Sequence, residues 1–172
     1  AIYRDMFKPH LVSRRRRRRQ GSHDVHQRQH RSFGNAGFLR PGHHAGRDNC
    51  GGYCYLNNAA IAAKWLTSAN LPEGSKPSGR LSKVAILDVD YHGGNGTQDI
   101  FYDSADVLTI SIHADPDWEY PYFAGYADEV GAGAGLGFHH NFPLPPRTDD
   151  AHYLQTLGEA ISLIQKFKPS ML

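Results

Sequence analysis

Three side chains of types that bind metal ions stand at every second position near the middle of the sequence: Asp88, Asp90 and His92. Residues two apart on an extended strand point to the same face, so the three project together if a strand continues as far as His92. Two carboxylates and an imidazole brought together would repel or take up protons unless a cation lay between them. Oxygen and nitrogen ligands without thiolate suit catalytic zinc, or manganese or iron. The spacing therefore predicts a site for Zn²⁺, with Fe²⁺ and Mn²⁺ as alternatives.

A plainer interpretation is a strand that ends in a capped turn, with Asp88 binding backbone amides and His92 on the surface. The glycine-rich segment 93–96 follows at once. The combination of this segment with the alternating ligands favours the metal site over the capped turn.

The residues before Asp88 predict how these side chains are held. Val84 to Leu87 is an unbroken apolar run, which is typical of a strand covered on both faces in a parallel sheet. Ligands of such sheets bind at the carboxyl ends of the strands. We also expect a strand at 107–113, another beginning after residue 168, helices at 56–68 and 97–102, and a final helix capped by Asp149 or Asp150 and ending near Phe167. This order predicts an α/β fold, a three-layer αβα arrangement with a mainly parallel sheet.

Two adjacent imidazoles, His43 and His44, follow a Pro41-Gly42 turn. Neighbouring residues point apart on a strand or a helix, so adjacent histidines usually have separate roles. The turn would let both face one cavity, where they fit a general acid and a general base. On its own the pair favours two surface residues, and only the neighbouring metal-binding segment favours the catalytic interpretation.

The net charge of +2 conceals two kinds of sequence. Residues 1–40 carry eleven Lys and Arg against two acids, and residues 41–172 carry eight against fifteen. The block Arg14 to Arg19 repels itself and has little to bury, so we expect a disordered tail, or a stretch translated in the wrong frame. A tail that binds nucleic acid is the alternative, which the scarcity of nearby aromatic residues disfavours.

Length and cysteine content set further bounds. A chain of 172 residues is long enough for one domain with a real core. Its two cysteines, Cys50 and Cys54, argue against a disulfide scaffold. No apolar run approaches the length of a membrane span, and the N-terminus lacks the apolar core of a signal peptide. We therefore expect a cytoplasmic protein without a membrane partner.

Residues 40–172 resemble the zinc-dependent histone deacetylase superfamily, and look most like its acetylpolyamine amidohydrolase branch. The resemblance rests on three motifs in the right order: Pro41-Gly42-His43-His44-Ala45, Gly51-Gly52-Tyr53-Cys54-Tyr55-Leu56-Asn57-Asn58-Ala59-Ala60, and the segment Leu87 to Phe101. The loop Asp115 to Pro121 and the pair Gly125-Tyr126 add the likeness to that branch. Residues 1–39 do not share it and are predicted to be a separate basic segment. The resemblance implies the arginase/deacetylase fold, of which this chain would form the middle.

The resemblance also implies a role for each motif residue. Asp90 and His92 match two of three metal ligands. His44 matches the general base and acid, oriented by Asn95, and His43 matches a second catalytic imidazole, held by Asp88. Tyr53 and Tyr120 match aromatic walls around the acyl chain, and Gly52 offers its carbonyl to the substrate. The backbone of Asp88, Asp90 and His92, with Ser111 and Ile112, matches a structural K⁺ site.

The implied activity is zinc-dependent hydrolysis of acetylated amines. The expected substrate is a small cationic acetylated amine or acetyl-lysine, and the expected protein partner is a second copy of the chain in a homodimer. Acids in the presumed mouth loop, Asp115, Asp117 and Glu119, agree with a cationic substrate or with a solvated surface. The family's third ligand, an Asp, and its oxyanion Tyr belong beyond Leu172. The isolated chain is therefore expected to be nearly inactive, and a catalytically silent metal-binding fragment is the second hypothesis. Nucleic-acid binding through Arg14 to Arg19 is the third.

Overall fold

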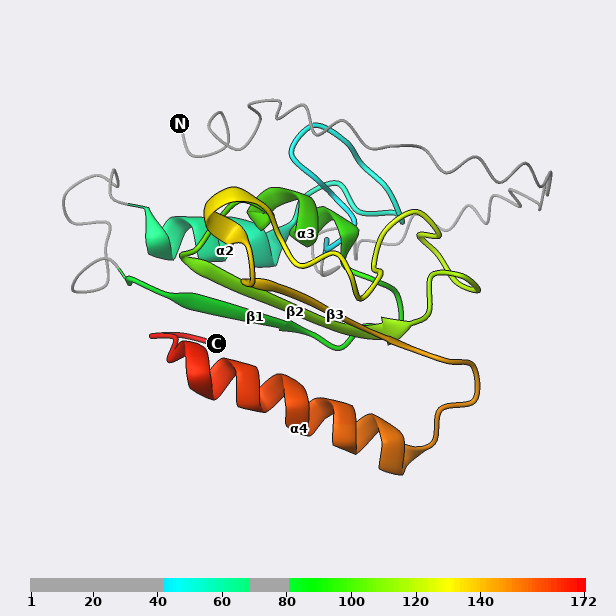
Figure 1. Ribbon diagram of the computed structural model, residues 1–172. Coiled ribbons are helices and arrows are strands. Elements are labelled where there is room, and N and C mark those ends of the chain that lie inside the picture. Colours follow the sequence, from blue (N-terminus) through cyan, green and yellow to red (C-terminus); the bar gives the residue numbers. More distant parts are fainter. Residues whose placement is uncertain (1–41, 69–80) are drawn as a thin grey trace.

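In a computed structural model of the protein, the structure describes residues 42–68 and 81–172 (Figure 1). In this part of the chain three strands form one parallel sheet: β1 (Val84–Asp88), β2 (Val107–Ala114) and β3 (His139–Leu144), in that spatial order. Val84 of β1 lies opposite Val107 of β2, and Thr109 of β2 lies opposite His139 of β3. The carboxyl ends of all three strands therefore lie at the same edge of the sheet.

Helices cover both faces of this sheet. Helices α2 (Asn58–Thr67) and α3 (Asn95–Phe101) lie on one face and α4 (Asp150–Phe167) lies on the other, as Figure 1 shows. A short 3₁₀ turn, η1 (Gly133–Gly135), precedes β3. The predicted α/β fold, three layers with a parallel sheet, is confirmed.

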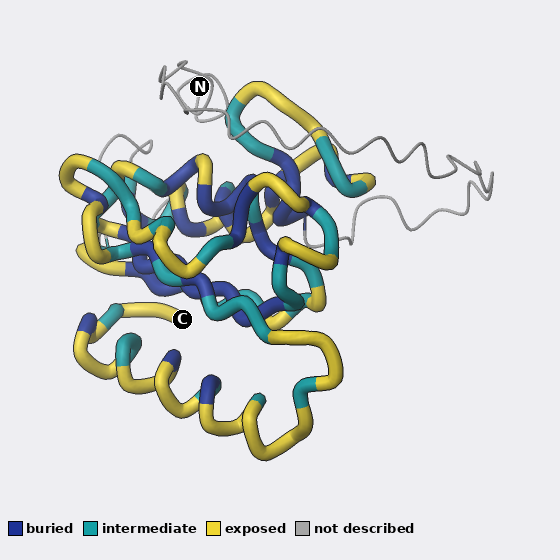
Figure 2. The backbone as a smooth tube through the Cα atoms, turned by 45° about the vertical axis from the view of Figure 1, so that its right-hand side comes forward, coloured by how far each residue is buried: buried dark blue, intermediate teal, exposed yellow. Residues whose placement is uncertain are grey.

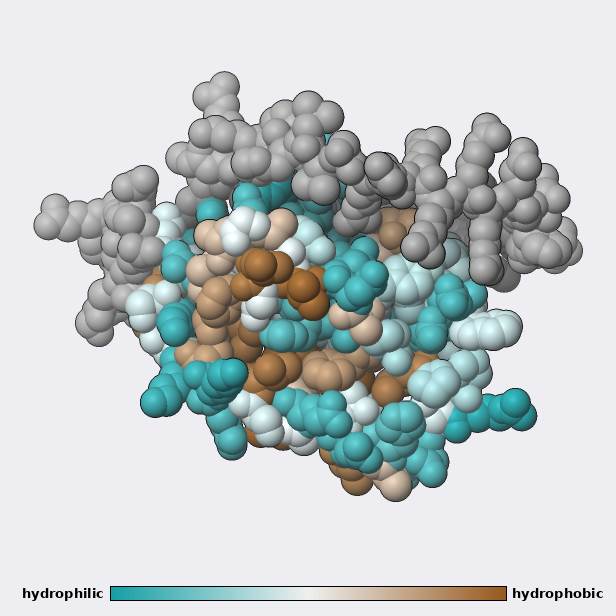
Figure 3. Space-filling view, in the orientation of Figure 1, coloured by the Kyte–Doolittle hydropathy of each residue, from teal (hydrophilic) through white to brown (hydrophobic). Residues whose placement is uncertain are grey.

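The central strand β2 supplies side chains to both layers of the core. Val107 packs with Ile100 and Phe101 under α2 and α3, whereas Ile110 and its neighbours at alternate positions pack against α4. This alternation follows from the period of two along a strand. Figure 2 shows the result, a buried sheet and an α4 whose outer surface is exposed. In Figure 3, hydrophobic side chains gather over η1 and along the seam between the sheet and α4.

The predicted ends of the helices agree with the structure to within a few residues. The helix expected at 97–102 begins at Asn95, and the final helix begins as predicted with the Asp149 side chain as its cap, accepting from the backbone N–H of His152 at 2.9 Å. The side chain of Asn57 caps α2 by accepting from Ala60 N at 3.0 Å. Such caps satisfy N–H groups that have no partner within the helix.

The strand β3 was not predicted, whereas the strand expected after residue 168 was. β3 reads His-His-Asn-Phe-Pro-Leu, which is polar and contains Pro143, so it lacks the apolar pattern of a buried strand. It lies at the edge of the described sheet, where proline is tolerated. The strand expected after residue 168 is present at its start, because Met171 forms a parallel bridge with Val84, and Ala85 N donates to Met171 O at 2.9 Å.

Several expectations fall on residues outside the described ranges. They include the disorder and nucleic-acid binding of Arg14 to Arg19 and the boundary between residues 39 and 40. Within residues 42–68 and 81–172, none of the helices is long and apolar enough to cross a membrane.

Candidate active site

The turn that carries the two histidines is held between α2 and α3. The backbone carbonyl of His43 accepts from the N–H groups of Gly96 at 2.8 Å and Thr97 at 3.1 Å, in the first turn of α3. The carbonyl of Ala45 accepts from Nδ2 of Asn57 at 3.2 Å. Because helix N-termini have spare donors, the main chain of this turn binds directly to α3. Both imidazoles are buried.

Each imidazole has its own hydrogen-bond partner. Nδ1 of His43 donates to Oδ2 of Asp88 at 2.7 Å, and Nδ1 of His44 donates to Oδ1 of Asn95, also at 2.7 Å. The ring centroids are 4.0 Å apart. Since the acceptors fix both tautomers, each ring keeps Nε2 free for chemistry. The structure therefore brings together the four residues whose catalytic roles the motifs imply.

The pKa values of the two histidines are shifted in opposite directions. Burial would lower the pKa of His43, but the hydrogen bond and charge of Asp88, with the charge of Asp90, outweigh it and raise that pKa. Burial lowers the pKa of His44, the positive charges of His43 and His92 lower it further, and the hydrogen bond to Asn95 does not compensate. One imidazole therefore favours the charged form and its neighbour the neutral form, an arrangement that separates acid from base.

The candidate metal ligands meet by a route other than the predicted one. β1 ends at Asp88 and does not continue to His92. Instead, Oδ1 of Asp88 accepts from Asp90 N at 3.0 Å, and Oδ1 of Asp90 accepts from His92 N at 2.9 Å. These two consecutive side-chain-to-backbone turns replace the strand, since short carboxylates compete with the sheet for nearby N–H groups. The condition under which the three side chains would share one face of a strand, a strand that continues to His92, is therefore not met.

The turns nevertheless place Asp90 and His92 together. Nδ1 of His92 lies 3.5 Å from Oδ1 of Asp90, and that oxygen lies 3.7 Å from Nε2 of His43. The side chains of Asp90 and His92 are each 39 % exposed. A carboxylate and an imidazole that face each other fit part of a zinc ligand set. Among the described residues no three His, Cys, Asp or Glu side chains are grouped to hold a metal ion.

The residues of the predicted K⁺ site lie at the carboxyl ends of β1 and β2. Asp88 and Ser111 are opposite each other in the sheet register. The hydroxyl of Ser111 bonds Nδ1 of His113 at 2.8 Å, and Ile112 is almost fully buried. Cation binding by this group stays a prediction.

The two predicted aromatic walls differ in position. The ring of Tyr120 lies edge-on to His44, with 4.8 Å between centroids, and 6.2 Å from His92. Tyr53 is 81 % exposed. Between them, Gly52 has a φ of +52°, and a β-carbon there would lie 2.0 Å from Cδ2 of His44. Only glycine can bring the backbone this close to the imidazole.

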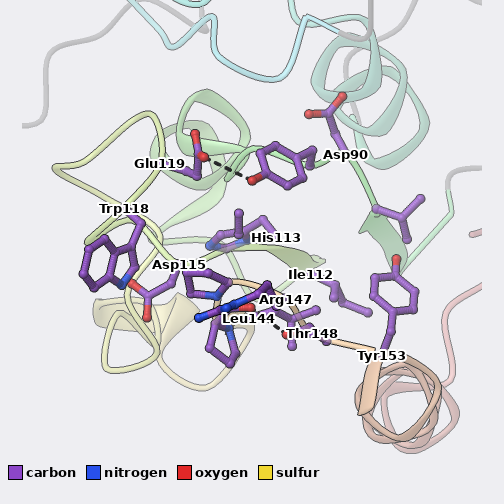
Figure 4. A pocket seen from close by; sticks show the side chains of 15 residues that line it. Asp90, Ile112, His113, Asp115, Trp118, Glu119, Leu144, Arg147, Thr148 and Tyr153 are labelled. Carbon is purple, nitrogen blue, oxygen red and sulfur yellow. Dashed lines mark hydrogen bonds between the residues drawn. The ribbon is translucent and has the colours of Figure 1, made fainter. Parts of the chain in front are cut away.

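A pocket of about 370 Å³ lies beside Asp90 at the carboxyl ends of the strands (Figure 4). Its lining includes Asp115, Trp118 and Glu119 from the loop after β2, and Arg147 from the loop after β3. Glu119 accepts from the hydroxyl of Tyr91 at 3.1 Å. Two of the acids that suggested a cationic substrate therefore face a cavity next to a candidate metal ligand.

A group of buried or half-buried polar side chains was missed by sequence reasoning. It comprises Gln98, His113, Glu129 and Asn141, which hydrogen-bond between α3, the strands and the loop after β2. The only signal was polar residues at alternate positions of a strand, as in His139 and Asn141, whose buried side faces α3. This alternation can be interpreted only once residues 139–144 are known to form a strand, β3.

Comparisons with known proteins agree with this geometry. The model of the histone deacetylase domain family matches residues 20–172. Acetylpolyamine amidohydrolase 2 of Pseudomonas aeruginosa is 56 % identical over 132 residues, which are 77 % of this chain and 36 % of that protein. Acetylpolyamine amidohydrolase 1 of the same organism is 54 % identical over 132 residues, 77 % of this chain and 35 % of that protein.

Solved structures give the same result. The crystal structure of acetylpolyamine aminohydrolase from Burkholderia pseudomallei matches with a TM-score of 0.69 and 44 % identity, covering 77 % of this chain and 36 % of that one. The chain thus spans about a third of the length of the relatives that it matches. The family match starts at residue 20, upstream of the motifs, and continues to residue 172. Because it covers most of the sequence, the chain belongs to the histone deacetylase domain family.

Proposed function

We propose that the protein containing this sequence hydrolyses acetylated amines with the help of a bound metal ion. The observation that carries the proposal is the pair of buried imidazoles, His43 and His44, each fixed by a different partner at 2.7 Å. The hydrolysis of an amide needs a group that takes a proton from the attacking water and gives one to the departing amine, and a neighbouring positive charge helps to stabilise the reacting oxygen.

His44 is assigned the proton transfers. Its Nδ1 proton is committed to Asn95, so Nε2 carries the lone pair that accepts a proton from the attacking water. The lowered pKa keeps this nitrogen unprotonated at neutral pH. The imidazolium formed in this way then protonates the nitrogen of the departing amine. His43, whose pKa is raised beside Asp88, supplies positive charge toward the oxygen of the reacting carbonyl.

Asp90 and His92 are assigned to the metal ion, with zinc as the first choice. When bound by these residues, zinc would supply Lewis-acid chemistry, the polarisation of the amide carbonyl and a lower pKa for a water molecule. A third ligand is assigned to the residues after Leu172. Met171 pairs with Val84, so a strand that continued in this register would reach the level of Asp88 about four residues later.

The substrate class is proposed to be a small acetylated amine that carries a second positive charge. Two observations support it. The relatives with 54–56 % identity are named acetylpolyamine amidohydrolases. Asp115 and Glu119 line the pocket next to Asp90, where carboxylates would attract a distant ammonium group. Acetyl-lysine in a peptide is the alternative substrate.

The direct test is acetate release by the full-length protein from acetylputrescine and from an acetyl-lysine peptide of equal concentration. We expect a higher kcat/KM for acetylputrescine, loss of activity with a chelator, and recovery when zinc is added back. Activity that survives complete removal of metal would contradict the metal assignment. A full-length protein that binds zinc but releases acetate from neither substrate would favour the second hypothesis, a catalytically silent metal-binding protein.

A further inference from the structure

A long loop, residues 115–130, brings Tyr120 to the two histidines; we call it the aromatic loop. It follows β2, and all its residues are described and lie outside helices and strands. The ring of Tyr120 lies 4.8 Å from that of His44, centroid to centroid. The loop's own backbone hydrogen bonds form only short turns, such as Trp118 N to Asp115 O at 3.0 Å and Glu129 N to Tyr126 O at 3.1 Å, so side chains also hold it in place.

Glu129 fixes the second half of the aromatic loop. Its Oε2 accepts from the backbone N–H groups of Gly125 at 2.7 Å and Tyr126 at 3.1 Å. Hydrogen bonds to an ionised acceptor are stronger than those between neutral groups. On the other side, Nε2 of His113 bonds the carbonyl of Gly125 at 2.9 Å. Gly125 has a φ of +103°, and a β-carbon there would lie 2.7 Å from that Nε2, so the backbone fits this place only as glycine.

Gln98 connects Glu129 to helix α3. Its Nε2 donates to Oε2 of Glu129 at 3.0 Å, and its Oε1 accepts from Nδ2 of Asn141 at 3.1 Å. Nδ2 of Asn141 also donates to the carbonyl of Tyr126 at 3.2 Å. Gln98 is only 2 % exposed, so both of its polar atoms would be costly to leave without partners.

The same helix holds His44. Asn95, which orients His44, precedes Gln98 by three residues, and residues three apart are neighbours on a helix surface. Helix α3 therefore anchors both the catalytic imidazole and, through Gln98 and Glu129, the loop that carries Tyr120. The imidazole and the second half of the aromatic loop are therefore connected to the same helix.

We propose that Glu129 and Gln98 are positioning residues for the hydrolysis: they fix the aromatic loop on α3 so that Tyr120 forms a wall against His44. The inference rests on the proposed function of this site. Neither residue reaches the reacting atoms in this scheme. Their loss therefore weakens the grip on the substrate more than it changes the chemical step.

The test uses the full-length protein with zinc bound. Glu129→Ala removes three hydrogen bonds from the loop, and we expect KM for acetylputrescine to rise about tenfold while kcat changes by less than about threefold. Asp128→Asn is the matched control, since it removes the charge of an exposed neighbouring carboxylate; its KM is expected to stay within about twofold of the wild type. An unchanged KM in active Glu129→Ala would overturn the positioning role.

Two further variants separate positioning from general damage. Gln98→Glu places a second carboxylate against Oε2 of Glu129 and is expected to raise KM at least as much as Glu129→Ala. Glu129→Gln keeps an oxygen that can accept from Gln98 and from the N–H groups of Gly125 and Tyr126, so its KM is expected to stay within about threefold of the wild type. An active Gln98→Glu with the KM of the wild type would contradict the proposal.

Amide hydrogen exchange provides a measurement independent of activity. Peptides from residues 120–130 should exchange at least about tenfold faster in Glu129→Ala than in Asp128→Asn, while peptides from α4 stay unchanged. If the wild type is active and Glu129→Ala keeps both its KM and its slow exchange, the positioning role fails and the proposed function stands. If the wild type hydrolyses no acetylated amine, the proposed function fails, and the positioning role fails with it.

Discussion

His44 donates its Nδ1 proton to the amide oxygen of Asn95 at 2.7 Å, whereas the adjacent His43 donates to the carboxylate of Asp88 at the same distance. The contrast between a neutral and a charged partner explains why two neighbouring imidazoles, 4.0 Å apart, differ in pKa. A neutral amide orients His44 without stabilising its protonated form as strongly as a carboxylate would. This relationship gives the first prediction.

Asn95→Asp is expected to raise the pKa of His44 by placing a negative charge behind it. Since His44 must be unprotonated to act as a base, the acid limb of kcat/KM should move up by about one pH unit or more. The measurement is a pH profile of acetate release by the full-length protein. An acid limb at the wild-type position would show that His44 is not the group that titrates.

Asp88→Asn is expected to shift the pKa of the other imidazole, His43, in the opposite direction. Removing the carboxylate leaves burial to dominate and lowers the pKa of His43. If the protonated form of His43 assists the reaction, the alkaline limb of kcat should move to lower pH. The acid limb set by His44 should move up, because a neutral His43 no longer lowers the pKa of His44. An alkaline limb at the wild-type position would contradict the role of His43.

Asp90→Asn and His92→Ala are expected to weaken zinc binding by the full-length protein at least about tenfold each, because each removes a ligand. Zinc bound at equilibrium is measured by dialysis followed by elemental analysis. Asp128→Asn and His152→Ala are matched controls, since both replace exposed residues of the same two types. Undiminished zinc binding in either ligand variant would remove that residue from the assigned ligand set.

His139 is expected to make folding stability depend on pH. Its pKa is lowered to about 4, first by burial and then by the positive charges of His140 and His113. Its Nε2 has no hydrogen-bond partner among the described residues. Between pH 6.5 and about 4 the unfolded chain binds a proton that the folded protein does not, so stability falls as pH decreases through this range.

The contribution of His139 to this loss is about 3 kcal/mol between the two pH limits. Denaturant unfolding of the full-length protein at pH 7 and pH 4.5 measures it. His139→Asn should lose less stability than the wild type over that interval, and His152→Asn, at an exposed position of α4, should behave like the wild type. Equal losses in all three proteins would contradict the assignment.

The sequence predicted those helices and strands that have a clear pattern of apolar residues or a capping residue. The apolar run before Asp88, the buried strand at β2 and the capped helix α4 were all expected, and the structure has them. β3 was missed because its inward residues, His139 and Asn141, are polar; Nδ1 of His139 bonds the hydroxyl of Thr109, and Nδ2 of Asn141 donates to Gln98. Such pairing depends on tertiary contacts that no local pattern records.

The candidate site was predictable in its residues but not in its geometry. The motifs indicated His43, His44 and Asp90, yet alternation along a strand was the wrong reason for expecting Asp90 and His92 to meet. Two side-chain turns bring them together, and these depend on where each carboxylate finds an N–H group. Glu129 and Gln98 carried no signal in the sequence, since their contacts span 31 residues.

The most direct test of the central claim is the rate of acetate release from acetylputrescine by full-length His44→Ala, compared with full-length His152→Ala. Zinc content is measured in the same samples. The account predicts that kcat falls about 10²- to 10⁴-fold in His44→Ala with zinc content unchanged, while His152→Ala keeps the wild-type rate. A His44→Ala protein that retains its zinc and releases acetate at the rate of the control would contradict the account.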